Sequence, residues 1–115
     1  MRILYVEDEE TMRELITHMI KMHIECDLVV VHSGNQAIKL LGNDQNFDVI
    51  VSDYQMPEGD GGKLLEYVVQ KGLSSYFILF TNTIEPRIKV KNEKFLGVIP
   101  KFQYEKLFKQ LKNIS

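Results

Sequence analysis

The stretch D-V-I-V-S-D-Y-Q-M-P-E-G-D-G-G, residues 48–62, decides the fold. An almost wholly apolar run, residues 49–52, ends at the carboxylate of Asp53, and Pro57 and a glycine cluster follow. Such a continuous run is typical of a strand that is covered on both faces. Asp53 therefore ends a buried strand, where its carboxylate serves either a turn or a chemical site.

Four further apolar runs, residues 3–6, 28–31, 76–80 and 98–99, alternate with stretches of helical periodicity. The apolar positions with helical spacing are Met12, Leu15, Ile16, Met19 and Ile20; then Ala37, Ile38 and Leu41; then Leu64, Leu65, Val68 and Val69; and finally Leu107, Phe108, Leu111 and Ile114. This alternation predicts an α/β fold, a doubly wound parallel sheet of five strands within one domain, residues 1–115.

The helix ends carry their own signals. Ser33 and Gln36 form a capping box, and Gly42 and Gly72 are the expected stops of the second and third helices. The segment 83–96 is different, because Pro86 suits only a first helical turn and the periodicity around it is poor. We predict that the fourth helix is short or irregular.

Composition indicates a soluble globular protein, with 44% apolar and 26% charged residues and a net charge of −2. Because Cys26 is the single cysteine and nothing resembles a signal peptide or a membrane span, we expect a cytoplasmic location. Eight of the fourteen basic residues lie within residues 87–112. They form either a solvated lysine face, which we favour, or a contact for an acidic partner, and no nucleic-acid motif accompanies them.

Polar side chains stand at the carboxyl ends of the predicted strands, where doubly wound sheets bind their ligands. The first strand ends in Glu7 and Asp8, the third in Asp53, the fourth in Thr81 and the fifth in Lys101. Crowded carboxylates repel by about 4 kcal/mol per pair at about 4 Å, so either their pKa values rise or a cation lies among them. Mg²⁺ suits such oxygen ligands, and a hydroxyl and an ammonium group would hold a phosphoryl oxygen. An aspartate can itself be the nucleophile, forming an acyl phosphate.

The chain resembles the receiver domain of two-component response regulators over essentially its whole length. The matching pieces are I-L-Y-V-E-D-E (3–9), S-G-N-Q-A-I-K-L-L (33–41), D-V-I-V-S-D-Y-Q-M-P-E-G-D-G (48–61), the strand end at Thr81 and G-V-I-P-K (97–101). The resemblance implies a flavodoxin-like sheet of strand order 2-1-3-4-5. It also implies a phosphoacceptor module of a two-component or phosphorelay system, whose phosphodonor is a histidine kinase or phosphotransfer protein.

Residue by residue, the resemblance implies Asp53 as phosphoacceptor, with Thr81 binding the phosphoryl group and Lys101 pairing with it. It implies Mg²⁺ as cofactor, held by Glu7, Asp8, Asp53 and the main-chain carbonyl of Gln55. The module would signal through a phosphorylation-dependent contact with a protein target that the sequence does not name. It would catalyse only its own phosphorylation and dephosphorylation, so we do not expect an enzyme with a turnover substrate.

Three positions depart from the family pattern. Pro100 precedes the lysine and Phe102 follows it, whereas the family usually has proline directly after the lysine. Val98 replaces the usual aromatic switch residue, and Asn82 stands where a small residue is usual. These changes put the usual signal relay in doubt while leaving the phosphorylation chemistry intact.

Other interpretations remain open. The altered relay is also compatible with a constitutive protein-binding pseudo-receiver whose phosphorylation site is vestigial. A phosphohydrolase of the haloacid-dehalogenase type would need an aspartate two residues after the nucleophile, where Gln55 stands, and is set aside. Singly, the V-E-D-E-E acids also suit a first helical turn. Since no output domain follows, we expect either a stand-alone receiver or part of a longer protein.

Overall fold

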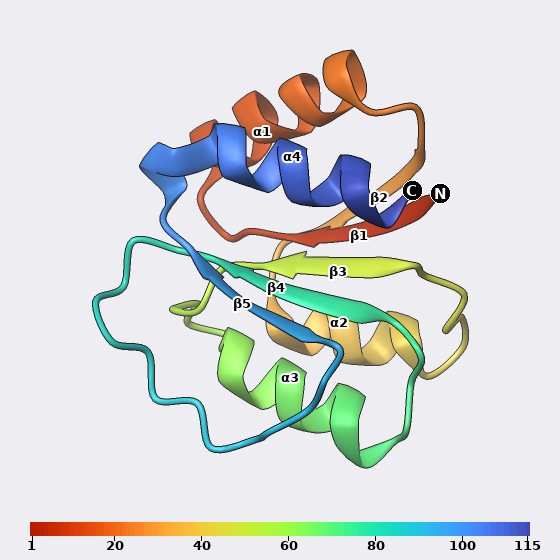
Figure 1. Ribbon diagram of the computed structural model, residues 1–115. Helices are drawn as coiled ribbons and strands as arrows, with labels where there is room; N and C mark the ends of the chain where they lie inside the picture. The colour runs from red at the N-terminus through yellow and green to blue at the C-terminus, as the bar shows by residue number, and fades with distance from the viewer.

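The computed structural model describes residues 1–115, which form one parallel five-stranded sheet with helices on both faces (Figure 1). The strand order is β2-β1-β3-β4-β5, as the resemblance implies. The elements in chain order are β1 (Arg2–Val6), α1 (Glu10–His23), β2 (Asp27–Val31), α2 (Gly34–Leu41), β3 (Val49–Ser52), α3 (Gly61–Gln70), β4 (Tyr76–Phe80), β5 (Phe95–Ile99), the 3₁₀ turn η1 (Lys101–Gln103) and α4 (Tyr104–Ile114).

Alternate residues of the strands supply two separate hydrophobic clusters. In β1, Ile3 and Tyr5 join the cluster beneath α1 and α4, whereas Leu4 and Val6 join the cluster beneath α2 and α3. Figure 1 shows these two helical layers above and below the sheet. Burial on both faces explains why the strands are continuous apolar runs rather than alternating ones.

The five predicted strands and four of the five predicted helices are confirmed, with differences at the boundaries. The fifth strand begins at Phe95 and is longer than the predicted residues 98–99. Only half of the predicted capping box forms: Ser33 accepts the amide of Gln36, but the Gln36 side chain accepts the amide of His32 rather than that of Ser33. The chain bends at His32 and Ser33, just before α2 begins.

The segment predicted as a short or irregular fourth helix forms no helix at all. From Thr81 to Lys94 the chain shows only isolated bends and a turn, so the connection between β4 and β5 is an irregular crossover. None of the helices is long and apolar enough to span a bilayer.

The loop after β3 is shaped by close backbone approaches. The amide of Gly61 donates to the carbonyl of Tyr54 at 2.7 Å, and a Cβ at Gly61 would lie 2.3 Å from the carbonyl oxygen of Asp53. Gly59 has φ +95°, a conformation that favours glycine. These glycines let α3 begin directly beneath the end of β3 and fix the backbone that carries Asp53.

Candidate functional site

Asp53 lies directly after β3, at the carboxyl edge of the sheet. Its amide donates to the carbonyl of Val6 at 3.0 Å, and its own carbonyl accepts the hydroxyl of Ser52 at 2.8 Å. Its Oδ1 accepts the amide of Tyr54 at 2.7 Å. The central position of β3 therefore places this carboxylate between the ends of β1 and β4.

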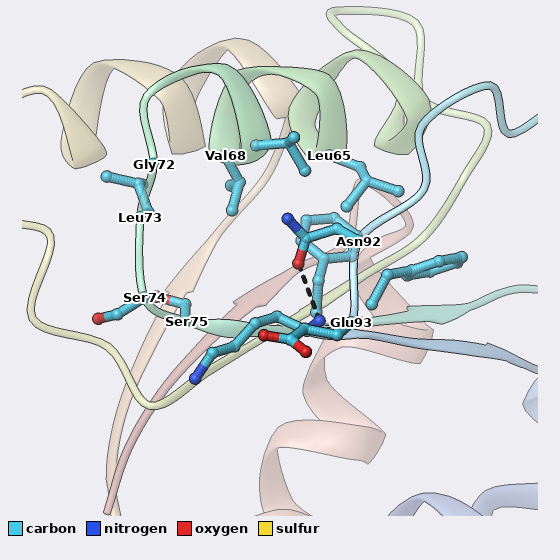
Figure 2. A pocket seen from close by; sticks show the side chains of 12 residues that line it. Leu65, Val68, Gly72, Leu73, Ser74, Ser75, Asn92 and Glu93 are labelled. Atoms are coloured by element: carbon cyan, nitrogen blue, oxygen red, sulfur yellow. Dashed lines mark hydrogen bonds between the residues drawn. The ribbon is translucent and has the colours of Figure 1, made fainter.

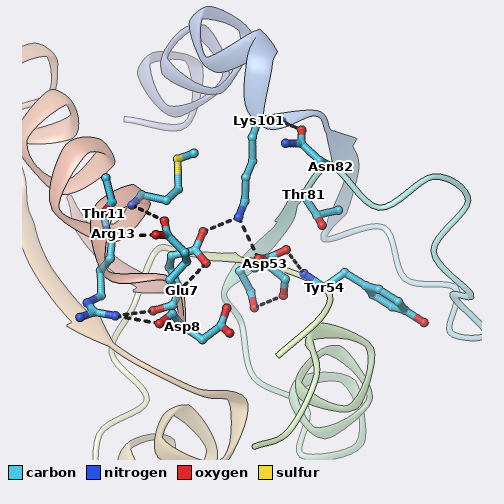
Figure 3. A network of polar contacts seen from close by, with 12 residues as sticks. Glu7, Asp8, Thr11, Arg13, Asp53, Tyr54, Thr81, Asn82 and Lys101 are labelled. Carbon is cyan, nitrogen blue, oxygen red and sulfur yellow. Dashed lines mark hydrogen bonds and ion pairs between the residues drawn. The ribbon is translucent and has the colours of Figure 1, made fainter. Parts of the chain in front are cut away.

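Lys101 joins two acids from different strands (Figure 3). Its Nζ lies 2.9 Å from Oδ2 of Asp53 and 2.6 Å from Oε1 of Glu7. The side chain of Glu7 is fully buried, and those of Lys101 and Asp53 are about nine-tenths buried. Loss of the lysine alone would therefore leave buried negative charge without a counterion, which is strongly unfavourable.

Burial shapes the ionisation of this group. Burial raises the pKa of Glu7 to about 7, although the contact with Lys101 opposes that rise, and the charge of Asp53 adds to it. For Lys101, burial alone would lower the pKa, but its ion pairs with Glu7 and Asp53 outweigh burial and raise the pKa above its usual value. The ammonium group of Lys101 is thus held charged between the two acids.

The carboxylates of Glu7, Asp8 and Asp53 form a cluster in which one oxygen of each lies within 4.8 Å of the others. Asp8 is exposed, whereas Glu7 is held by Lys101 through Oε1 and by the amide of Glu9 through Oε2. One lysine does not balance three acids, and oxygen ligands open to water suit Mg²⁺. The donor set therefore fits that ion, with Asp8 the freest ligand.

The neighbouring acids serve the helix rather than the cluster. Glu9 caps α1, accepting the amides of Thr11 and Met12. The expectation that V-E-D-E-E contains an acidic helix start thus holds for Glu9, while Glu7 and Asp8 face Asp53. Arg13 donates to the main-chain carbonyls of both Glu7 and Asp8 at 3.2 Å.

A small polar pocket of about 250 Å³ opens beside Asp53. Its lining residues are Asp53, Gln55, Thr81, Asn82, Thr83 and Lys101. The structure thus gathers the predicted residues at one rim, although Thr81 makes no hydrogen bond to Asp53 or Lys101. Its Oγ1 instead donates to Oγ1 of Thr83 and accepts the Thr83 amide, at 3.1 and 3.2 Å.

Of three further contributors to the site, Asn82 was noted in the sequence as a departure beside Thr81, whereas Arg13 and Tyr54 were not predicted. Asn82 Oδ1 accepts the amide of Lys101 at 2.9 Å and so joins the ends of β4 and β5. Arg13 holds the loop of the acidic pair, and Tyr54 reaches the crossover. The available signal for Asn82 was its place directly after Thr81, and that for Tyr54 was its place directly after Asp53. No such signal marked Arg13, which resembles an ordinary surface residue of a helix.

The family comparison agrees with this arrangement. The response regulator receiver domain family matches residues 3–112. The chain belongs to that family. This receiver domain has the expected five-stranded fold, and its family belongs to two-component signalling.

Plant relatives are similar over part of the chain. The receiver domain is 35% identical over 69 residues to the two-component response regulator ARR12 of Arabidopsis thaliana, covering 59% of this chain and 11% of that protein. It is 35% identical over 66 residues to ORR5 of Oryza sativa subsp. japonica, covering 57% and 48%. The match thus spans about a tenth of the length of the first relative and about half of the second.

Solved structures share the fold over nearly the whole length. The response regulator TrrA of Thermotoga maritima, in complex with Mg²⁺-BeF, superposes with a TM-score of 0.85 at 23% identity, covering 99% of this chain and 98% of that one. TrrA in complex with the histidine kinase ThkA gives a TM-score of 0.81 at 24% identity, with 98% and 97% covered. CheY4 of Vibrio cholerae gives 0.79 at 22% identity, with 99% and 98% covered. At these identities the likeness establishes the fold alone.

Proposed function

We propose that this receiver domain takes a phosphoryl group onto Asp53 from a phosphohistidine of a histidine kinase or phosphotransfer protein. The P–N bond of the donor breaks as a P–O bond to a carboxylate oxygen of Asp53 forms. The imidazole nitrogen keeps the electron pair of the broken bond and takes up a proton from water. The observation that carries the proposal is the contact of one buried lysine, Lys101, with both Glu7 and Asp53 beside a wholly polar pocket.

The chain's own residues divide the work of transfer. Lys101 already contacts Oδ2 of Asp53 and would bind the phosphoryl oxygens as they approach that carboxylate. Thr81 would exchange its hydrogen bond to Thr83 for one to the phosphoryl group. The Tyr54 amide orients Asp53 through Oδ1. Mg²⁺, held by Glu7, Asp8, Asp53 and the Gln55 carbonyl, would neutralise charge on the transferring group.

The module would act in the cytoplasm as a switch rather than as an enzyme with a turnover substrate, because the only group it transfers is the one that it carries. Two observations support this use: TrrA, a protein of the same fold, was solved with a histidine kinase, and another TrrA structure contains Mg²⁺-BeF. Signalling would occur through a protein target whose binding depends on the phosphate.

A second function, constitutive protein binding by a pseudo-receiver, is favoured by the missing crossover helix and by Val98, which is 41% exposed in place of an aromatic switch residue. Incubation with acetyl phosphate and Mg²⁺, and separately with an autophosphorylated histidine kinase, distinguishes the two functions. Gain of one phosphoryl group by intact mass supports the switch. Absence of labelling from both donors, with a known receiver labelled in parallel, supports the pseudo-receiver.

A further inference from the structure

The crossover between β4 and β5 contains residues 87–91, which we call the basic strip. It shows no turn or bend, and in Figure 1 it belongs to the tube that leads to β5. Arg87, Lys89 and Lys91 are exposed, whereas Ile88 and Val90 are half-buried against the cluster beneath α2 and α3. Burial that alternates every second residue is the periodicity of a β-strand.

The strip is strand-like but has no strand partner. The amide and carbonyl groups of residues 88–91 make no hydrogen bond within the chain. Both ends are nevertheless fixed. At one end the Tyr54 hydroxyl bonds to the backbone of Arg87, and beyond the other end the amide of Phe77 in β4 donates to the carbonyl of Lys94 at 2.9 Å. The strip is therefore held in position with its backbone donors and acceptors free.

Its charge is uncompensated. The ion pairs of the molecule involve Arg2 and Lys101, and none involves Arg87, Lys89 or Lys91. Three positive charges thus lie on one exposed row of five residues. Like charges on a strand row repel a second copy of the same row, so the strip disfavours pairing with itself and favours an acidic partner.

A pocket with one apolar side and one polar side adjoins the end of the strip, and half of its twelve lining residues are hydrophobic. It has a volume of about 300 Å³ and lies between α3 and residues 92–95. Figure 2 shows Leu65, Val68 and Leu73 around it, with Asn92 at its rim. A pocket of this kind accepts one bulky apolar side chain, as pockets beside strand-addition sites do.

We propose that the basic strip binds an extended acidic segment of a partner protein by strand addition, with an apolar side chain of that segment in the pocket beside Asn92. Backbone pairing with residues 88–91 would supply affinity, and carboxylates opposite Arg87, Lys89 and Lys91 would supply specificity. The edge of β5 is a poorer site, because the positive φ of +105° at Gly97 interrupts it. This inference goes beyond the proposed function and needs no phosphate on Asp53.

The probe is a synthetic peptide that alternates Glu and Val and ends in Leu, titrated into the ¹⁵N-labelled, unphosphorylated chain. We expect shifted and exchange-protected amides at residues 88–91, with binding that weakens as salt rises. The triple variant R87E/K89E/K91E should bind about tenfold more weakly, as the loss of three surface ion pairs implies. K106E/K109E/K112E on the exposed face of α4 makes the same charge change and should bind like the wild type.

Two modified peptides test the geometry without altering the protein. A peptide N-methylated at alternate residues keeps its charge but loses the backbone N–H donors of those residues. It should bind at least about tenfold more weakly than the unmodified peptide. A peptide without the terminal Leu should lose the shifts around Leu65 and Val68. Equal binding of the N-methylated peptide would overturn strand addition, and unchanged shifts without Leu would overturn the pocket assignment.

The class of partner is tested in the same titration. A single-stranded oligonucleotide of matched charge should perturb residues 88–91 less than the peptide. Tighter binding of the oligonucleotide, or concentration-dependent self-association through these amides, would overturn the proposal. Failure of Asp53 to be phosphorylated would leave it intact, so the two proposals fail separately.

Discussion

Tyr54 is hydrogen-bonded to Arg87 across the loop. The Tyr54 oxygen accepts the Arg87 amide at 3.2 Å, and its hydroxyl lies 3.5 Å from the Arg87 carbonyl oxygen, to which it donates. The amide of the same Tyr54 donates to Oδ1 of Asp53 at 2.7 Å. One residue thus contacts both the candidate phosphoacceptor and the irregular crossover.

We predict that phosphorylation acts mainly by changing order in residues 82–96 rather than by an aromatic flip, since Val98 is short and stiff at χ1. Hydrogen exchange with and without beryllofluoride measures this change. The bound state can shift only an equilibrium whose two states it binds differently, so the coupling must run through contacts such as those of Tyr54 and Asn82. Unchanged protection across 82–96, despite demonstrated binding at Asp53, would show the prediction to be wrong.

Tyr54→Phe removes the bond to Arg87 and keeps the ring. We expect the Arg87 amide, which is hydrogen-bonded to the Tyr54 oxygen, to lose about 1 kcal/mol of protection, seen as faster exchange, and the crossover to respond less to beryllofluoride. Tyr67→Phe on α3 is the matched control and should change neither. An unaltered response in Tyr54→Phe would remove Tyr54 from the coupling.

Lys101→Met removes the cation that contacts Glu7 and Asp53 at similar side-chain length. In EDTA we expect a loss of about 3 kcal/mol in the free energy of unfolding, because two buried carboxylates lose their counterion. Mg²⁺ should restore part of the loss by supplying positive charge to the same acids. Lys106→Met is the control. An equal loss with and without Mg²⁺ would contradict the account.

The raised pKa of Glu7 predicts that the free energy of unfolding depends on pH in metal-free buffer. Its pKa is near 7 in the folded chain and near 4.5 when exposed, so between these values the folded state holds a proton that the unfolded state has lost. The stability contributed by Glu7 is therefore present below about pH 4.5 and is lost as the pH rises through about 7. Relative to Glu7→Gln, the wild type should lose on the order of 3 kcal/mol across that window.

Urea unfolding of both proteins in EDTA at several pH values measures this difference. Glu66→Gln, an exposed acid on α3, is the control and should follow the wild-type curve. Parallel curves for the wild type and Glu7→Gln would mean that Glu7 ionises normally.

Divalent metal binding should be weak in the free chain and should depend on Asp8 and Asp53. A Mg²⁺ titration followed by NMR should perturb residues 7, 8, 53 and 55. Asp8→Asn and Asp53→Asn should weaken binding strongly, and Glu7→Gln less, because Lys101 already holds Glu7. Asp27→Asn at the opposite edge of the sheet is the control. No perturbation around these residues would count against the metal site.

The sequence predicted the sheet well because buried parallel strands are continuous apolar runs, and it predicted the site because parallel strands end at one edge. The length of β5 was not predictable, since Gly97 breaks its apolar run and adopts a positive φ. The prediction of a short or irregular helix in the crossover is wrong, because the period-two pattern with Ile88 and Val90 inward covers only five residues and gives a weak signal. The contacts of Tyr54 with Arg87 join residues far apart in the chain, and no local pattern encodes them.

The most direct test of the central claim is to map the phosphorylated residue. The wild type and Asp53→Ala are incubated with acetyl phosphate and Mg²⁺, the acyl phosphate is trapped by borohydride reduction, and the modified peptide is identified by mass spectrometry. We predict that the modification lies on Asp53, requires Mg²⁺ and is absent from Asp53→Ala. Undiminished labelling of Asp53→Ala, or a modified residue elsewhere in the wild type, would contradict the assignment.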